Sequence, residues 1–269
     1  MKDKPIKKAL KYILESKKYI FAIIFVFFTF VLIGFFFPDK FSFLDEQLKE
    51  LINKTVGLKG IELIEFIFFN NIKSAFFGII AGIFLGIIPI FTSILNGAVL
   101  GYVFAKVYQV SGFSEFWRIL PHGIFELPAV FIALGIGLRL GFSLPPFISS
   151  FFRHYWKKNK MVSVFPFIAS ILPLLLLAFT ISVSKTNFNI LSLIFIPILF
   201  VFMFTFFFVI NIVFMGFGCF ILDKKFRKNH IIYEYFNNIN NAFLVLFFVI
   251  LPLLIIAAII EGTLISLIK

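Results

Sequence analysis

The sequence predicts an all-α protein, a polytopic transmembrane helical bundle of about seven spans with one short amphipathic surface helix. Hydrophobic residues make up 61% of the 269 positions and charged residues 14%, whereas soluble domains hold about half and about a quarter. The mean hydropathy is +1.06. The apolar residues gather in runs about as long as a bilayer is thick, and lysine-rich blocks separate several of these runs. Lipid is therefore the expected solvent for most of the surface.

The N-terminal part combines a basic segment with an apolar run. Residues 1–18 are rich in lysine and are expected to lie in the cytoplasm. The run 19–37 is too long for a signal peptide and lacks a small-residue cleavage site, so it is predicted to be a retained first transmembrane helix. Pro38 follows the run and is expected to end it.

Residues 39–65 are predicted to form an extracytoplasmic amphipathic segment. Ser42 and Asp45 have the spacing of a capping box. Apolar residues then recur at helical spacing, namely Leu44, Leu48, Leu51 and Ile52. A short helix that lies on the membrane surface is the expected structure.

Residues 66–142 are predicted to be a core of three transmembrane helices, at 66–88, 90–108 and 116–140. Little more than Pro89 separates the first two, which predicts a tight helical hairpin. Small residues repeat every four positions on both, and such stripes let helix backbones approach closely in membranes. The predicted packing residues of this hairpin are Gly78, Gly82, Gly86, Gly97 and Gly101.

Residues 143–269 are predicted to be a C-terminal transmembrane region with cytoplasmic basic loops. Spans are expected at 165–183 and 242–268. The run 189–222 is too long for one simple span and short for two. The basic blocks at 153–160 and 224–228 should share the cytoplasmic side, which favours one long or broken helix. The N-terminus is then cytoplasmic and the C-terminus lies outside.

Polar residues inside the predicted spans are candidates for function, because charged groups in lipid cost several kcal/mol. The candidate cluster consists of Asn70, Asn71, Lys73, Asn96, His122, Glu126 and Glu261. His122 and Glu126 are four positions apart and share one helical face. Equal depths in the membrane predict that Lys73 pairs with Glu126, and that Asn70 or Asn71 bonds His122.

Several of these residues lie in motifs that resemble the stage II sporulation protein M family of integral membrane proteins. The motifs are Asn70-Asn71 with the glycine stripe, Asn96-Gly97-x-x-x-Gly101, Leu120-Pro121-His122-Gly123-Ile124-Phe125-Glu126-Leu127-Pro128-Ala129, Gly137-Leu138-Arg139-Leu140-Gly141 and Ala257-Ala258-Ile259-Ile260-Glu261-Gly262. The resemblance covers 66–142 and 251–263, and it makes 165–183 and 189–222 additional spans. It implies a multi-pass membrane component without established catalytic activity. The family's founding member works in a membrane complex with a peptidoglycan hydrolase.

Two functions remain open on the sequence. The first is a non-enzymatic scaffold or subunit of a membrane complex, in which the polar residues satisfy one another across packed helices. The second is a transporter or channel subunit with an intramembrane site at His122 and Glu126. An intramembrane metalloenzyme is disfavoured, because catalytic zinc usually takes three protein ligands and an HExxH motif is absent.

The remaining expectations concern partners and location. No cofactor, metal or catalytic residue is predicted, and the protein is not expected to be an enzyme. The lone Cys219 excludes an intramolecular disulfide. The expected partners are the lipid bilayer and other membrane proteins or a second copy of the chain, and not nucleic acid, because the basic residues lie in blocks that orient a chain in a bilayer. The expected location is the cell membrane.

Overall fold

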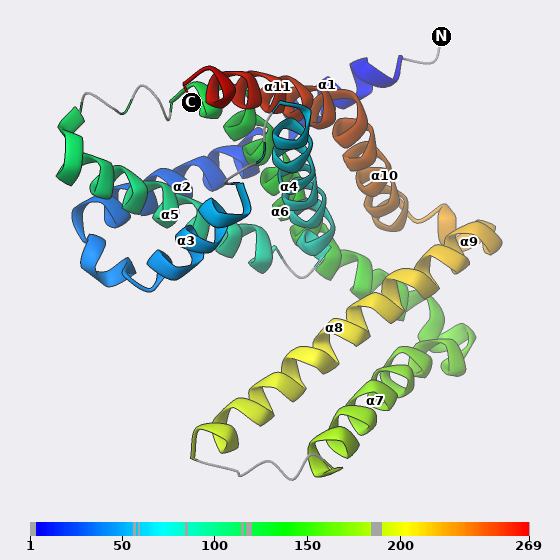
Figure 1. Cartoon of the computed structure of the whole chain (residues 1–269). Coiled ribbons are helices and arrows are strands. Elements are labelled where there is room, and N and C mark those ends of the chain that lie inside the picture. The colour runs from blue at the N-terminus through cyan, green and yellow to red at the C-terminus, as the bar shows by residue number, and fades with distance from the viewer. Residues whose placement is uncertain are drawn as a thin grey trace. The chain divides into compact units, whose positions relative to one another are not determined.

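The computed structural model describes residues 4–55, 58, 60–83, 86–113, 116, 120–183 and 190–268, and its regular structure in these ranges is helical (Figure 1). The chain divides into two compact units. The first comprises Met1–Phe142 and Asn238–Lys269, and the second comprises Ser143–Asn237. The boundaries between the units fall inside two helices, α6 (Leu120–Lys158) and α10 (His230–Val245).

The first unit contains the N-terminal helices and the C-terminal end of the chain. Besides the first part of α6 and the end of α10, its elements are α1 (Pro5–Glu15), α2 (Lys17–Phe36), η1 (Pro38–Phe41), α3 (Leu44–Thr55), α4 (Ile61–Ile80), η2 (Ala81–Ile83), α5 (Ile87–Ser111), η4 (Leu246–Ile250) and α11 (Leu251–Ile268). Its main apolar core joins residues of α1, α4, α6, α10, η4 and α11. The second unit contains the rest of α6 and α10, with α7 (Lys160–Val183), α8 (Ile190–Leu222) and α9 (Lys224–Arg227) between them.

The predicted fold class is confirmed. In the described part of the chain, 6 helices are long and apolar enough to cross a membrane. They cover Lys17–Phe36, Ile61–Ile80, Ile87–Ser111, Gly123–Trp156, Leu199–Leu222 and His230–Leu264. A shorter apolar helix, Lys160–Leu175, lies where the span 165–183 was predicted. The run 190–222 is one continuous helix, as the distribution of basic blocks predicted.

The fourth predicted span is longer than expected. This span was predicted to end at residue 140, with 153–160 in a loop, whereas α6 continues to Lys158. The helix passes through Pro145-Pro146, where Leu144 and Phe147 on either side are both fully buried. Packing of these side chains compensates for the backbone hydrogen bonds that the prolines remove, so the helix is not interrupted.

The N-terminal basic segment also contains more structure than predicted. Residues 5–15 form helix α1, whose Ala9 and Tyr12 are buried in the core of the first unit. Pro5 occupies the first turn, where its missing N–H costs nothing. Ser16 separates α1 from α2, and its hydroxyl donates a 2.7 Å hydrogen bond to the Tyr12 carbonyl.

Candidate functional site

Two pairs of closely packed helices build the candidate site, and the first pair is α2 with α5. A side chain at Gly97 would collide with the carbonyl of Phe27, and one at Gly101 would collide with the carbonyl of Val31. Ser93 of α5 donates a 3.0 Å hydrogen bond to the Ile23 carbonyl of α2. The backbones of these helices therefore lie in direct contact, as small-residue stripes permit.

The second pair is α4 with α6. A side chain at Gly82 would collide with the backbone of Gly137, and one at Gly137 would collide with the carbonyl of Gly78. Gly86 has a φ of +74° and forms the turn into α5, a left-handed conformation that favours glycine. Pro89, which was predicted to divide the two helices, lies in the first turn of α5.

The glycine stripes are thus packing surfaces, but the predicted partners were wrong. We expected them to join α4 to α5 as a hairpin. Instead the α4 stripe packs on α6 and the α5 stripe packs on α2. A stripe of small residues specifies that some backbone approaches closely, and it does not specify which one.

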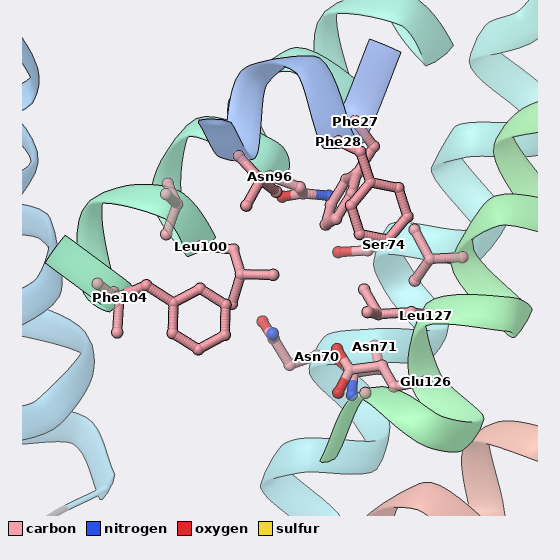
Figure 2. Close-up of a pocket in the computed structure, with 15 residues that line it drawn as sticks. Phe27, Phe28, Asn70, Asn71, Ser74, Asn96, Leu100, Phe104, Glu126 and Leu127 are labelled. Carbon is pink, nitrogen blue, oxygen red and sulfur yellow. The ribbon is translucent and has the colours of Figure 1, made fainter. Parts of the chain in front are cut away.

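A cavity of about 460 Å³ lies among these four helices (Figure 2). Most of its lining is apolar, with aromatic rings from α2 and α5. Its lining residues are Phe27, Phe28, Val31, Asn70, Asn71, Ser74, Asn96, Val99, Leu100, Val103, Phe104, Gly123, Glu126, Leu127 and Val130. The structure therefore brings four members of the predicted polar cluster to one place, namely Asn70, Asn71, Asn96 and Glu126.

Glu126 is the ionisable residue of this cavity lining, and its neighbours come from two other helices. The side chain of Asn71 is hydrogen-bonded to the Glu126 carboxyl group, and Figure 2 shows the two side by side. Glu261 of α11 lies close enough for the two carboxyl groups to interact electrostatically. Helix α11 packs along α4, which explains how a residue near the C-terminus reaches this site.

The other polar residues of the cavity lining differ in burial. Asn71 is buried, whereas Asn70, Ser74 and Asn96 are exposed in the single chain. Asn70 and Ser74 are one helical turn apart and therefore share a face of α4. Sequence reasoning missed Ser74, although its spacing from Asn70 was a usable signal. It also missed the lining phenylalanines, because the chain holds 45 of them and composition does not single out any.

The predicted ion pair between Lys73 and Glu126 is not formed, because Lys73 is exposed and Glu126 interacts with Asn71 and Glu261. The predicted contact of an asparagine with His122 concerns a side chain that lies outside the described residues.

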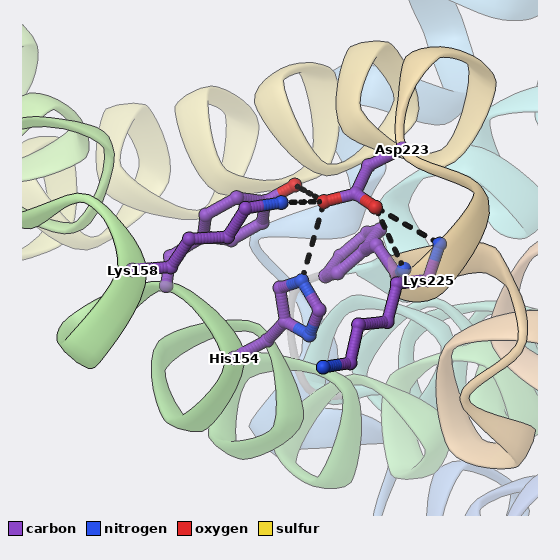
Figure 3. Close-up of polar contacts among 6 residues, drawn as sticks. His154, Lys158, Asp223 and Lys225 are labelled. Atoms are coloured by element: carbon purple, nitrogen blue, oxygen red, sulfur yellow. Dashed lines mark hydrogen bonds and ion pairs between the residues drawn. The ribbon is translucent and has the colours of Figure 1, made fainter.

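A second polar cluster, in the other unit, was not predicted. Asp223 accepts hydrogen bonds from the Lys158 ammonium at 2.7 Å and the Tyr155 hydroxyl at 3.2 Å, and His154 Nε2 lies 3.3 Å away (Figure 3). Its other oxygen accepts from the backbone N–H of Lys225 at 2.9 Å, which caps α9. The hydrogen bond from Lys158 holds the pKa of Asp223 well below its ordinary value.

The segment 39–65, which was predicted to be amphipathic, is attached to α5 of the first pair of helices. The Tyr102 hydroxyl of α5 donates a 2.6 Å hydrogen bond to Asp45 of α3, and Lys106 Nζ lies 3.7 Å from the same carboxylate. The bond from Tyr102, with the charge of Lys106, lowers the pKa of Asp45. The expected capping box is not used in this way. Asp45 lies inside the first turn of α3, and its side chain binds α5 rather than the helix end.

Nothing in the described residues forms a metal centre, since no three histidine, cysteine, aspartate or glutamate side chains come together there. In a comparison with known families, the sequence model for Stage II sporulation protein M matches residues 23–186. The match begins inside α2 and includes α4, α5 and α6, the helices that form the cavity with α2. It also covers 165–183, which was predicted to be a span additional to the family pattern. The predicted closing motif around Glu261 lies beyond it. No curated protein and no solved structure matches the chain.

Proposed function

The chain belongs to the stage II sporulation protein M family, and on that premise we propose that this multi-pass membrane protein is a non-catalytic subunit of a membrane complex. The observation that carries the proposal is the exposure of polar residues that line the cavity. Asn70, Ser74 and Asn96 are exposed there, although all three belong to helices of transmembrane length. A polar group left in hydrocarbon without a hydrogen-bond partner costs several kcal/mol.

A transmembrane helix of a partner protein would remove this cost. The apolar lining, with Phe28, Leu100 and Phe104, offers contact surface for the partner's apolar side chains. An amide or hydroxyl on the same helix would bond Asn70 and Asn96. Interhelical amide bonds of this kind stabilise membrane helix pairs by about 0.6–2 kcal/mol each. The partner is either another membrane protein or a second copy of this chain.

Photo-crosslinking in the native membrane tests the proposal. Benzoylphenylalanine at Leu100, which lines the cavity, should give a discrete protein adduct whose mass identifies the partner. The same group at Phe21 of α2, 66% exposed and outside the cavity lining, is the matched control and should give lipid adducts. Lipid adducts alone at both positions would contradict the proposal. Residue 100 crosslinked to a second copy of the chain would assign a homo-oligomer.

A second candidate is a transporter or channel subunit, and the proximity of Glu126 to Glu261 favours it. Two carboxyl groups that interact inside a membrane can share a proton or a cation, which is what proton relays use. Liposomes that hold only this protein should then conduct protons, and Glu126→Gln should abolish the flux. Lys73→Met is the matched control, because it also removes one charged side chain, and Lys73 is exposed on α4 outside the cavity lining. An unchanged flux in Glu126→Gln would eliminate this candidate.

We propose further that the protein lies in the cell membrane with its N-terminus in the cytoplasm and its C-terminus outside. The support is the distribution of basic residues, which cluster before α2, at 153–160 and at 224–228. In a Cys219→Ala background, a cysteine at Ser42 should react with an impermeant thiol reagent from outside. A cysteine at the exposed Lys160 should react only after the membrane is permeabilised. Labelling of residue 160 in intact cells would reverse the assignment.

A further inference from the structure

Helix α1 has three distinct faces. Ala9 and Tyr12 form the first face and are buried against the bundle, with 0% and 2% of their surfaces exposed. A row of apolar side chains at helical spacing forms the second face and is exposed, with Ile6 at 48%, Leu10 at 50% and Leu14 at 70%. The third face is basic and carries Lys4, Lys7, Lys8 and Lys11. At about 100° per residue, the apolar row lies between the buried face and the basic face.

Arg139 of α6 fixes the rotation of this helix. Its guanidinium donates a 2.9 Å hydrogen bond to the Ser16 hydroxyl and lies 4.2 Å above the centre of the Tyr12 ring. It also lies 3.5 Å from the carboxylate of Glu15. Because Arg139 holds Tyr12 and Ser16 against the bundle, α1 cannot rotate about its axis to bury its exposed apolar row. The row is a fixed outer surface of the first unit.

The position of α1 along the chain places this row at the membrane boundary. Only Ser16 separates α1 from the transmembrane helix α2, which begins at Lys17. Lys18 Nζ lies 4.8 Å from the centre of the Tyr19 ring at the start of α2, and cations with aromatic rings are typical of the headgroup level. With 11 residues and a basic face, α1 is too short and too polar to cross a bilayer itself.

We propose that α1 anchors the first unit to the anionic lipids of the leaflet that it faces. Ile6, Leu10 and Leu14 enter the boundary of the acyl chains, and the lysines bind phosphate groups of the lipids. An amphipathic helix of this kind lies in the plane of the interface, and anionic headgroups are the complement of its basic face. A second copy of the chain is a poorer occupant, because two such lysine faces would repel each other.

Fluorescence quenching in nanodiscs tests this proposal. An environment-sensitive fluorophore is attached to Leu10→Cys in a Cys219→Ala background, in discs of phosphatidylcholine with or without phosphatidylglycerol. Phosphatidylglycerol should lower the quenching of the label by an aqueous quencher by about threefold or more, since each lysine near an anionic surface favours association about fivefold. The same label at Lys8→Cys, on the basic face at the headgroup level, should be quenched more strongly than the label at residue 10 in discs with phosphatidylglycerol.

Charge variants separate the lipid from other occupants. Replacing Lys4, Lys7, Lys8 and Lys11 by glutamine should abolish the effect of phosphatidylglycerol on the label at residue 10. Replacing Lys224, Lys225, Arg227 and Lys228 by glutamine removes the same formal charge elsewhere and should leave the effect intact. Equal quenching of residue 10 in both lipids would overturn the proposal. Protection that occurs only in discs with two copies of the protein would also overturn it and would assign the row to a dimer contact.

Discussion

Gly82, in the η2 turn that continues α4, is the position at which a single added methyl group should best reveal the packing of this segment on α6. The methyl of Gly82→Ala would collide with the carbonyl group and the Cα of Gly137. Because both sides of this contact are backbone, no side-chain rotation relieves it. The two backbones have to separate by roughly 1.5 Å at this point to restore ordinary van der Waals contact, which loses attraction along the interface.

The magnitude follows from the cost of overpacking. Extra methyl groups in a packed interior typically cost about 1–3 kcal/mol, and we expect about 3 kcal/mol where backbone meets backbone. A chain of this size loses about 2–4 °C in Tm per kcal/mol, so Gly82→Ala should lower Tm by about 6–12 °C. Thermal unfolding of the purified protein in a non-ionic detergent measures this shift.

Two further glycines supply graded controls. A methyl group at Gly78 would lie 2.7 Å from Cδ2 of Leu134, the end of a flexible side chain, so Gly78→Ala should cost only about 1 kcal/mol. A methyl group at Gly218 of α8 would meet nothing within 4 Å, and Gly218→Ala should be neutral or gain about 0.5–1 kcal/mol of helix stability. The reasoning is refuted if Gly82→Ala unfolds at the same temperature as Gly218→Ala.

Two other predictions concern charged and polar side chains. The folded-state pKa of Asp223 lies below its ordinary value of 3.8, so its contribution to stability is full above that value and is lost as the pH falls through the folded pKa. Lys158→Met should therefore reduce the loss of Tm between pH 7 and acid, and an unchanged acid profile would contradict the role of Lys158. Asn71→Leu should destabilise the protein by about 1–3 kcal/mol, because it removes the hydrogen bond of Glu126, whereas Lys73→Met should change Tm little. Equal losses in the two variants would place Lys73, against expectation, in the buried network.

The membrane-spanning helices could be predicted from the sequence because their cause is local. The length of an apolar run decides whether a helix can span a bilayer. The lysine blocks indicate on which side of the bilayer each run begins and ends, and therefore whether a long run crosses once or twice. That reasoning predicted α8 as one helix. It failed at α6, where the basic residues at 153–160 were assigned to a loop beyond the predicted end at residue 140. The helix continues because Leu144 and Phe147 are buried, and that burial depends on residues distant in the sequence.

The packing of the glycine stripes was predictable only in part. Gly82 and Gly101 were recognised as sites of close approach, and both contact another backbone. Their partners, Gly137 and Val31, were not predicted, because a small residue permits close contact with any neighbouring helix at the same depth in the membrane. Gly137 had been quoted only as part of a family motif. A glycine on each of two helices is a stronger signal than a stripe on one, and that reciprocity identifies α6 as the partner of α4.

The pairing predicted for Lys73 was wrong because depth in the membrane does not decide which residues of two helices face each other. Depth in the membrane was calculated from the rise per residue, and this places Lys73 and Glu126 at similar levels. Depth gives no information about the direction in which a side chain points. At about 100° per residue, Asn71 lies within about 20° of Gly78 and Gly82, whereas Lys73 lies roughly 140° from Gly78. The face that carries the glycines is the face that packs on α6. The angular position of Asn71 around the axis of α4 therefore makes it the neighbour of Glu126, whereas that of Lys73 leaves it exposed.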